Sequence, residues 1–174
     1  MQLDFEVRSC SRTCSETQRS LQPGDVYFSV LIEQETELLR HDYSAEVWGG
    51  PPDECLGWWR SRIPESENTS PKLAPADVML NLFVALEKRP QEFSLRYMLG
   101  LLLLRRRVLR CEETRLHADG GEVLSLFCPR RNEDYELTVA EPDDQEAEAI
   151  QQRMIDLVYG DSETVTNESA DLEE

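Results

Sequence analysis

The feature that most constrains this chain is an apolar run at residues 97–104 that ends in a cluster of arginines. A membrane-spanning helix needs about 20 apolar residues, so this run is too short to cross a bilayer. Apolar side chains around it recur at helical spacing, which predicts a buried central helix over residues 91–109. The predicted core face of that helix consists of Phe93, Tyr97, Leu101, Leu104 and Val108.

The residues before this helix indicate β-structure. Residues 3–7 alternate between apolar and polar side chains, as a half-buried strand does. Residues 26–32 are rich in β-branched and aromatic side chains, and a polar turn at residues 33–37 lets residues 38–40 pair back on them as a hairpin. Residues 49–74, which open with two glycines and two prolines, are predicted to be a loop with embedded aromatic residues.

The rest of the chain switches between helical and strand patterns. Pro75 can begin a first helix and Pro90 ends it, because proline lacks the backbone donor and clashes with the preceding turn. Beyond the central helix, a β-hairpin and a third strand are expected at residues 111–116, 122–128 and 135–139. A last helix begins near Glu141 and stops at Gly160. These elements predict an α+β fold with an N-terminal β-hairpin unit, a central helical pair, a β-meander and a C-terminal helix.

Charge is distributed unevenly along the chain. The net charge is −17, yet residues 88–131 carry a net +5 and residues 132–174 a net −14. Such a protein is repelled at long range by nucleic acid and by anionic membrane surfaces, so we expect neither as a partner. Residues 161–174 contain six acids and no basic residue. We therefore expect a disordered acidic tail after a single domain of residues 1–160.

The five cysteines argue against a disulfide framework, because their number is odd. Residues 1–6 also lack the basic and apolar segments of a secretory signal, so the expected location is the cytoplasm. Cys10 and Cys14 are candidate zinc ligands, although three residues separate them where structural zinc sites mostly have two. Further ligands would have to come from Cys55, Cys111, Cys128, His41 or His117. Buried cysteines that pack as small apolar side chains are the favoured interpretation, so no cofactor is predicted and zinc is the alternative.

Residues 57–62 place two tryptophans, Trp58 and Trp59, beside two arginines, Arg60 and Arg62. The favoured interpretation is that the tryptophans pin a loop to the domain while the arginines pair with nearby acids. Contact with a protein partner comes second, because tryptophan and arginine are frequent anchors of interfaces. Stacking on single-stranded nucleic acid comes third, because the acidic field opposes it.

A second cationic group, here called the arginine fan, consists of Arg96, Arg105, Arg106, Arg107 and Arg110. Guanidinium groups can bind phosphate or an acidic peptide through bidentate contacts. The alternative is that they stabilise the negative end of the helix dipole and pair with internal carboxylates. A third hypothesis is that the tail, residues 161–174, folds over the fan and competes with an anionic partner.

The sequence contains no catalytic signature above background. His41 and His117 lie in unrelated contexts, and neither a glycine-flanked serine nor a phosphate-binding loop is present. The acids are too numerous for one pair to be assigned as general acid and base. No catalytic residue is predicted, and an enzyme ranks third among the functional hypotheses.

Several motifs are similar to those of an uncharacterised family of small bacterial proteins. The motifs are Thr17-x-Arg19-x-Leu21-x-Pro23–Gly24–Asp25-x-Tyr27, Arg40-x-Asp42–Tyr43, Gly57–Trp58–Trp59–Arg60–Ser61–Arg62-x-Pro64 and residues 96–110. The similarity covers residues 5–158 and implies a bacterial cytoplasmic protein, with no known activity, cofactor or partner. The segment around Cys14 also resembles a zinc-ribbon knuckle.

The sequence therefore predicts a non-catalytic protein-binding or adaptor protein with an unidentified partner. Its candidate contact residues are Trp58, Trp59, Arg60, Arg62, Arg105, Arg106 and Arg107. The alternative is a zinc-ribbon-like metal-binding module that uses Cys10 and Cys14 and is associated with nucleic acid.

Overall fold

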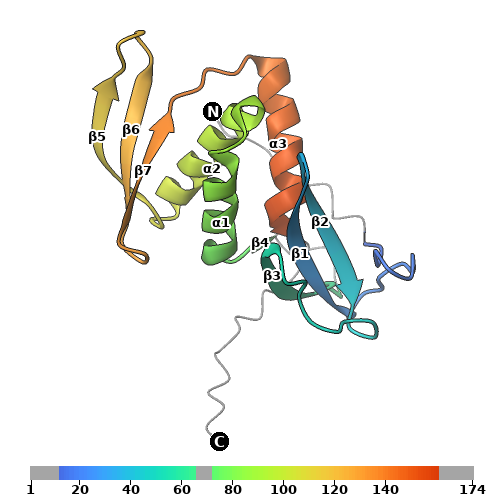
Figure 1. The fold of residues 1–174 in the computed structure, drawn as a ribbon. Coiled ribbons are helices and arrows are strands. Elements are labelled where there is room, and N and C mark those ends of the chain that lie inside the picture. Colours follow the sequence, from blue (N-terminus) through green and yellow to red (C-terminus); the bar gives the residue numbers. More distant parts are fainter. Residues whose placement is uncertain (1–11, 66–71, 161–174) are drawn as a thin grey trace, which may run out of the picture. The chain divides into compact units, whose positions relative to one another are not determined.

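The computed structural model describes residues 12–65 and 72–160, which divide into two compact units (Figure 1). The first unit contains the chain up to Val78 and the segment from Ile155 onward, and the second contains Met79–Met154. The α+β class and the predicted order of the elements are confirmed. The single domain expected over residues 1–160 stays a prediction. The strand expected at residues 3–7 and the acidic tail lie outside the described residues.

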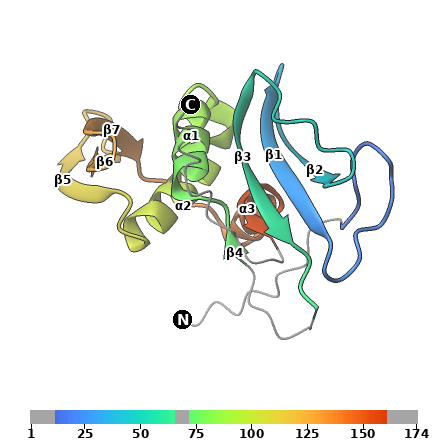
Figure 2. The same ribbon diagram turned by 90° about the horizontal axis from the view of Figure 1, so that it is seen from below.

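The first unit is built on a three-stranded antiparallel sheet in the order β2-β1-β3 (Figure 2). The predicted hairpin is confirmed by β1 (Val26–Gln34) and β2 (Glu37–Ser44), which are joined by a tight turn at Glu35 and Thr36. The third strand, β3 (Cys55–Arg62), comes from the segment predicted to be a loop, so that prediction is wrong. Two glycines and two prolines do precede a turn at Asp53 and Glu54, directly before this strand. The eight residues of β3 nevertheless pair with β1, a non-local contact that turn signals cannot reveal.

The first unit also contains two short strands and a small apolar core. Strand β4 (Lys72–Leu73) pairs with β8 (Tyr159–Gly160), so Gly160 belongs to a short strand and does not simply end a helix. A small apolar core, against which Val47 packs, holds four buried side chains: Cys14, Leu21, Tyr27 and Ile63. The first unit thus buries its N-terminal loop against its own sheet.

The helices follow the sequence less closely. Helix α1 (Ala76–Leu86) starts directly after Pro75, but it ends before Pro90, which opens the short helix η1 (Pro90–Glu92). Helix α2 (Phe93–Arg105) buries its other side: Leu95, Arg96, Leu99, Gly100 and Leu103 are buried, whereas Phe93 is 47% exposed and Leu101 37%. The predicted core face of this helix is therefore wrong. Apolar residues surround most of α2, so their spacing did not determine the buried side, which also contains an arginine.

The second sheet has the order β5-β6-β7, and the predicted meander is confirmed. Strands β5 (Arg110–Leu116) and β6 (Glu122–Cys128) form the hairpin across residues 118–121, and β7 (Glu133–Thr138) is the third strand. Helix α3 (Asp144–Val158) follows and continues into the first unit. Because α2 ends at Arg105 and not near residue 109 as predicted, Arg106 and Arg107 follow the helix and Arg110 begins strand β5.

Candidate functional site

Four aromatic side chains gather on one face of the first sheet, here called the aromatic face: Phe28, Tyr43, Trp48 and Trp58. Side chains alternate between the two faces of a strand. In the register of the sheet, Phe28 lies opposite Tyr43 on one neighbour and opposite Arg60 on the other. Trp58 is two residues from Arg60 on β3, so it shares their face.

Trp48 joins this face from the loop after β2. Its ring stacks on that of Phe28 with 4.5 Å between the centroids and 2° between the planes. The ring centroids of Trp48 and Trp58 are 5.6 Å apart, and those of Trp48 and Tyr43 are 6.0 Å apart. All four side chains are half-buried, so the cluster still presents aromatic surface to solvent. Sequence reasoning missed Phe28, Tyr43 and Trp48, because only the strand pairing brings them to Trp58.

The predicted contact residues of β3 lie on both faces of the strand. Trp58, Arg60 and Arg62 share the outer, aromatic face, where both arginines are exposed and form no ion pair with a described residue. Trp59 points to the opposite face, is only 4% exposed, and has the guanidinium of Arg40 5.2 Å from its ring centroid. Of the two tryptophans, Trp59 thus packs inside the unit and Trp58 remains accessible.

The inner face of this sheet holds a buried charge cluster. Arg40 donates from Nε to Oδ1 of Asp42 at 3.0 Å, and the same carboxylate oxygen accepts a 2.6 Å hydrogen bond from Ser29. A further guanidinium nitrogen of Arg40 donates to the carbonyl oxygen of Tyr159 in β8. The cluster is satisfied within the unit, so it holds the sheet and β8 together.

Cys14 is a buried thiol that packs in the small core with Tyr27 and Ile63, with donors aimed at its sulfur. Burial alone would raise its pKa, but the backbone N–H of Ser44, 3.4 Å from Sγ, and donors from Thr17 and Glu16 lower the pKa to about 6. Burial raises the pKa of Tyr43, with further contributions from the negative charges of Glu16 and Cys14. Within residues 12–65 and 72–160, no three His, Cys, Asp or Glu side chains are placed to hold a metal ion. Cys10 lies outside the described residues.

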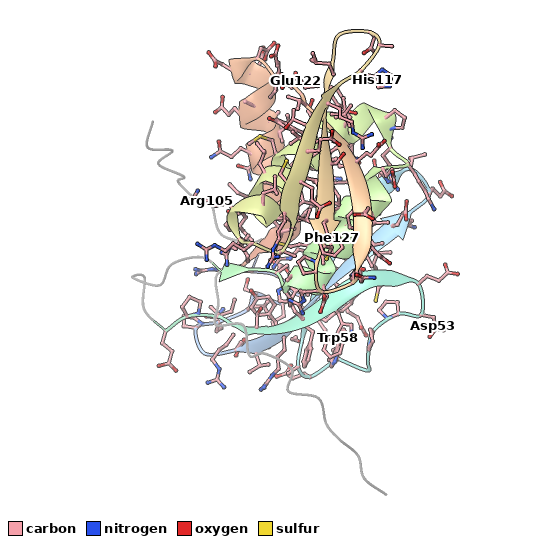
Figure 3. The ribbon with its side chains drawn as sticks, turned by 90° about the vertical axis from the view of Figure 1, so that its left-hand side faces the viewer. Asp53, Trp58, Arg105, His117, Glu122 and Phe127 are labelled. Carbon is pink, nitrogen blue, oxygen red and sulfur yellow. The ribbon has the colours of Figure 1, made fainter. Side chains whose placement is uncertain are left out.

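The arginine fan belongs to the second unit. Helix α2 ends in a Schellman motif, in which the N–H of Val108 bonds to the carbonyl of Leu103 and the N–H of Arg107 to that of Leu104. Arg107 has a φ of 60°, the left-handed conformation that this motif requires at that position. Arg105, Arg106 and Arg107 are exposed and form no ion pair with a described residue, whereas Arg96 is buried. Figure 3 labels Trp58 on β3 and Arg105 on α2; since they belong to different units, we treat them as separate surfaces.

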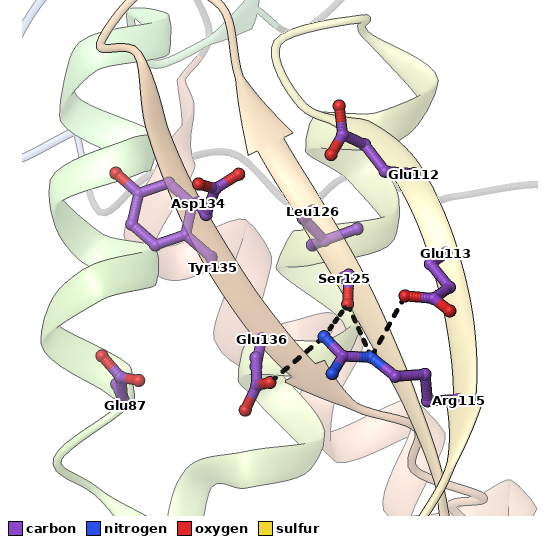
Figure 4. A pocket seen from close by; sticks show the side chains of 9 residues that line it. All are labelled: Glu87, Glu112, Glu113, Arg115, Ser125, Leu126, Asp134, Tyr135 and Glu136. Atoms are coloured by element: carbon purple, nitrogen blue, oxygen red, sulfur yellow. Dashed lines mark hydrogen bonds and ion pairs between the residues drawn. The ribbon is translucent and has the colours of Figure 1, made fainter.

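The second unit also contains an open cavity of about 650 Å³ on its sheet (Figure 4). It is lined by Glu87, Glu112, Glu113, Arg115, Ser125, Leu126, Asp134, Tyr135 and Glu136. Arg115 forms ion pairs with Glu113 and Glu136 at 3.4 and 3.6 Å and donates to Ser125 at 2.6 Å. The hydroxyl of Ser125 therefore accepts from a cation, and it forms no hydrogen bond with a carboxylate of the described residues. The arrangement attracts positive charge but does not form a nucleophile with its base.

In comparisons with known proteins, no family model, curated protein or solved structure matches the chain. The resemblance to small bacterial proteins therefore stays a prediction. None of the described helices has the length and apolar character needed to cross a membrane.

Proposed function

We propose that this chain is a non-catalytic protein-binding protein that contacts its partner through the aromatic face and the neighbouring Arg60 and Arg62. The observation that carries the proposal is the outer face of the first sheet. It holds four half-buried rings in mutual contact and two exposed arginines that have no described ion pair. Aromatic residues and arginine are the residue types enriched at the centres of protein interfaces. An ordinary solvated sheet face would carry mainly polar side chains at these positions.

The charge of the whole chain favours a protein over a nucleic acid as the partner. Aromatic rings with arginine could also stack unpaired bases. A net charge of −17 opposes the approach of any polyanion of high charge density, however, and that opposition grows as salt is removed. A short acidic peptide experiences less of this repulsion and can still pair with two arginines. The arginine fan is proposed as a second, separate contact surface.

Selection of displayed peptides tests the proposal. A library of random 16-residue peptides would be selected on the immobilised full chain, on Trp58→Ala, and on Leu116→Ala as a matched control. Leu116 is 74% exposed on β5 and belongs to the other unit. We expect the wild type and the control to enrich the same peptides and Trp58→Ala to lose them. Truncating a central aromatic anchor costs 2 kcal/mol or more, about a thirtyfold loss of affinity.

Equal enrichment on Trp58→Ala and on the wild type would contradict the proposal, as would a failure to enrich any peptide. Circular dichroism of each variant shows whether the sheet is intact. If Trp58→Ala is unfolded, Arg60→Glu replaces it, because Arg60 is exposed and its removal leaves the aromatic rings in place.

The second candidate is a zinc site at Cys14, which one observation favours. A sulfur that accepts backbone donors and has a pKa of about 6 is suited to bind a metal as thiolate. Zinc would be measured on protein purified under reducing conditions without added metal. About one zinc per chain, lost in Cys14→Ser and kept in Cys55→Ser, would establish the site. A zinc-free wild type would leave Cys14 as a buried thiol.

We also propose a cytoplasmic location. Cys14, Cys55, Cys111 and Cys128 are all free thiols, and two of them are not buried. Accessible free thiols persist in reducing compartments.

A further inference from the structure

We propose that the aromatic face binds an acidic, proline-rich peptide in the polyproline II conformation. The inference deepens the proposed function and rests on it, because it names the class of peptide that the same face and its two arginines recognise. Its support comes from the place of the rings on the sheet, from their spacing, and from the charge beside them.

The place of the rings determines which kind of backbone can lie on them. Strand β1 directs its backbone hydrogen bonds to β2 on one side and to β3 on the other, so the middle of the sheet presents side chains to a ligand. A peptide that crosses this face gains ring contacts but no ladder of backbone hydrogen bonds. Polyproline II suits such a surface, because its backbone stays solvated without internal hydrogen bonds and proline fixes its shape before binding.

The rings of the face are tilted against one another. The ring of Trp48 meets that of Tyr43 at 43° and that of Trp58 at 42°. Tilted rings do not cover each other's faces completely, and all three side chains are half-buried, so part of each ring is accessible. Proline-rich peptides dock on aromatic side chains that are accessible in this way.

The spacing of two of the rings fits the repeat of a polyproline II helix. Tyr43 lies on β2 and Trp58 on β3, and β1 lies between these strands. Neighbouring strands are about 4.8 Å apart, so about 10 Å separate β2 from β3 across the sheet. Polyproline II has three residues per turn and rises about 3.1 Å per residue, so prolines one turn apart are separated by about 9 Å. Two such prolines can therefore reach Tyr43 and Trp58, with Trp48 between them.

Arg60 and Arg62 determine the charge of the peptide. Both are exposed on the aromatic face, and Arg60 lies opposite Phe28 in the register of the sheet. Their guanidinium groups can pair with carboxylates at one end of the peptide, and they repel a cation. Aromatic cages for cations also surround their ligand with ring faces. Here Phe28 and Trp48 stack on each other, so the geometry favours an acidic peptide over a methylated lysine.

Isothermal titration calorimetry of the full chain at about 0.15 M salt tests the proposal. The probe is a synthetic peptide of nine prolines, about three turns of the helix, followed by Asp-Glu-Asp. One comparison peptide has alanines in place of the prolines, and another ends in three lysines. We expect the probe to bind at least about tenfold more tightly than either. The net charge of −17 favours the lysine peptide at long range, so a preference for acids reports the local arginines.

Variants of the full chain locate the bound probe. Trp58→Ala should weaken binding about thirtyfold. Arg60→Glu/Arg62→Glu should reverse the preference, so that the peptide with lysines binds more tightly than the probe. This variant leaves the four rings in place and therefore keeps the test valid if Trp58→Ala does not fold. The matched control Arg105→Glu/Arg106→Glu changes the net charge equally but lies in the second unit, and it should leave the preference unchanged.

Other ligands and other surfaces give different results, and each would overturn the inference. Equal affinity for the proline and alanine peptides would show that polyproline II is not recognised. Loss of the acid preference in the Arg105→Glu/Arg106→Glu control would place the peptide on the arginine fan. Displacement of the probe by a deoxythymidine oligomer would assign the aromatic face to unpaired bases, and displacement by trimethyllysine would assign it to a cation.

The two proposals fail separately. If the displayed library yields peptides that require Trp58 but lack proline, and the proline probe does not bind, the proposed function stands and this inference falls. If neither the library nor the probe binds, both fall. Binding of the probe that is lost in Trp58→Ala and reversed in Arg60→Glu/Arg62→Glu supports both.

Discussion

Arg40 in the first unit and Arg96 in the second have buried side chains, and the two are held in opposite ways. In the first unit, Arg40 pairs with the carboxylate of Asp42, which is equally buried. In the second unit, Arg96 is 8% exposed and donates to the carbonyl oxygens of Phe83 and Glu136, at 3.2 and 2.8 Å. Its guanidinium also lies 4.4 Å from the ring centroid of Phe83.

The difference lies in how the buried charge is compensated. Arg40 and Asp42 neutralise each other, so removal of either partner leaves a charge in the interior. Arg96 is held by dipoles and a ring face, its one carboxylate neighbour is Glu87 at 3.9 Å on the surface, and its Nη2 has no hydrogen-bond partner among the described residues. Burial accordingly lowers the pKa of Arg96. The stability of the first unit should therefore fall when one of the paired charges is removed. The stability of the second unit should fall when a hydrogen-bond donor is removed.

The largest effect is expected from Asp42→Ala. This variant leaves the guanidinium of Arg40 buried without its carboxylate, which costs about 3–5 kcal/mol of unfolding free energy. Urea unfolding followed by tryptophan fluorescence reports it directly, because Trp48, Trp58 and Trp59 all lie in the first unit. Arg40→Met/Asp42→Ala, which removes both charges, should recover part of the loss. A cost below about 1 kcal/mol would mean that the pair is not buried as described.

A smaller loss is expected from Arg96→Met. The variant leaves two carbonyl oxygens without a donor but no unpaired charge, so the cost is about 2 kcal/mol. Far-UV circular dichroism during urea unfolding is the suitable measurement, since the second unit contains no tryptophan. If Arg96→Met costs as much as Asp42→Ala, the contrast between the two arginines is wrong.

The same contrast shows what the sequence could and could not predict. Local signals were sufficient for the hairpin across residues 118–121 and for the third strand after it, because turn chemistry and alternation act over a few residues. The buried side of α2 could not be predicted, since burying Arg96 depends on carbonyls of α1 and β7. The spacing of apolar residues cannot predict the burial of a polar residue that finds hydrogen-bond partners in the interior.

The candidate site was only partly predictable for a related reason. Trp58, Arg60 and Arg62 were identified by residue type, but the strand that separates Trp59 from them was not recognised. Phe28 and Trp48, which stack on each other, lie thirty and ten residues before Trp58 in the sequence. Only the pairing of β1 with β3 and the path of the loop after β2 bring these rings together.

In each unit, one glycine lies so close to a neighbouring side chain that its replacement by alanine tests the packing. A Cβ built on Gly57 would lie 2.7 and 3.0 Å from the two Cγ atoms of Val78, and a stiff β-branched side chain cannot turn away. A Cβ on Gly100 would lie 2.4 Å from the end of the flexible Leu137 side chain, and alanine gains about 1 kcal/mol of helix propensity there. We expect Gly57→Ala to cost about 1–2 kcal/mol and Gly100→Ala to be close to neutral. If the two variants lose the same free energy of unfolding in urea, the side chains of Val78 and Leu137 move aside equally easily, and this prediction is wrong.

The smallest expected effect is a gain of stability from Arg107→Gly. Arg107 adopts a φ of 60° at the end of α2, which costs a side-chain-bearing residue about 1–2 kcal/mol, while glycine loses part of this advantage through its freer unfolded state. The net gain should be about 0.5–1 kcal/mol, seen as a higher melting temperature by circular dichroism. The neighbour Arg106 has a φ of −81°, so Arg106→Gly is the matched control and should lower stability.

The first unit offers the same test at Glu35, whose φ is 48° in the turn between β1 and β2. Glu35→Gly should stabilise that unit by a similar amount, and equal behaviour of Arg106→Gly and Arg107→Gly would contradict the strain argument. A gain of stability in both variants would mean that each unit has an exposed charged residue at a position where glycine would make the protein more stable. Arg107 bears the strain of a positive φ and forms no ion pair with a described residue. This observation favours a role of the arginine fan in contacts with a partner over a role in stabilising the helix.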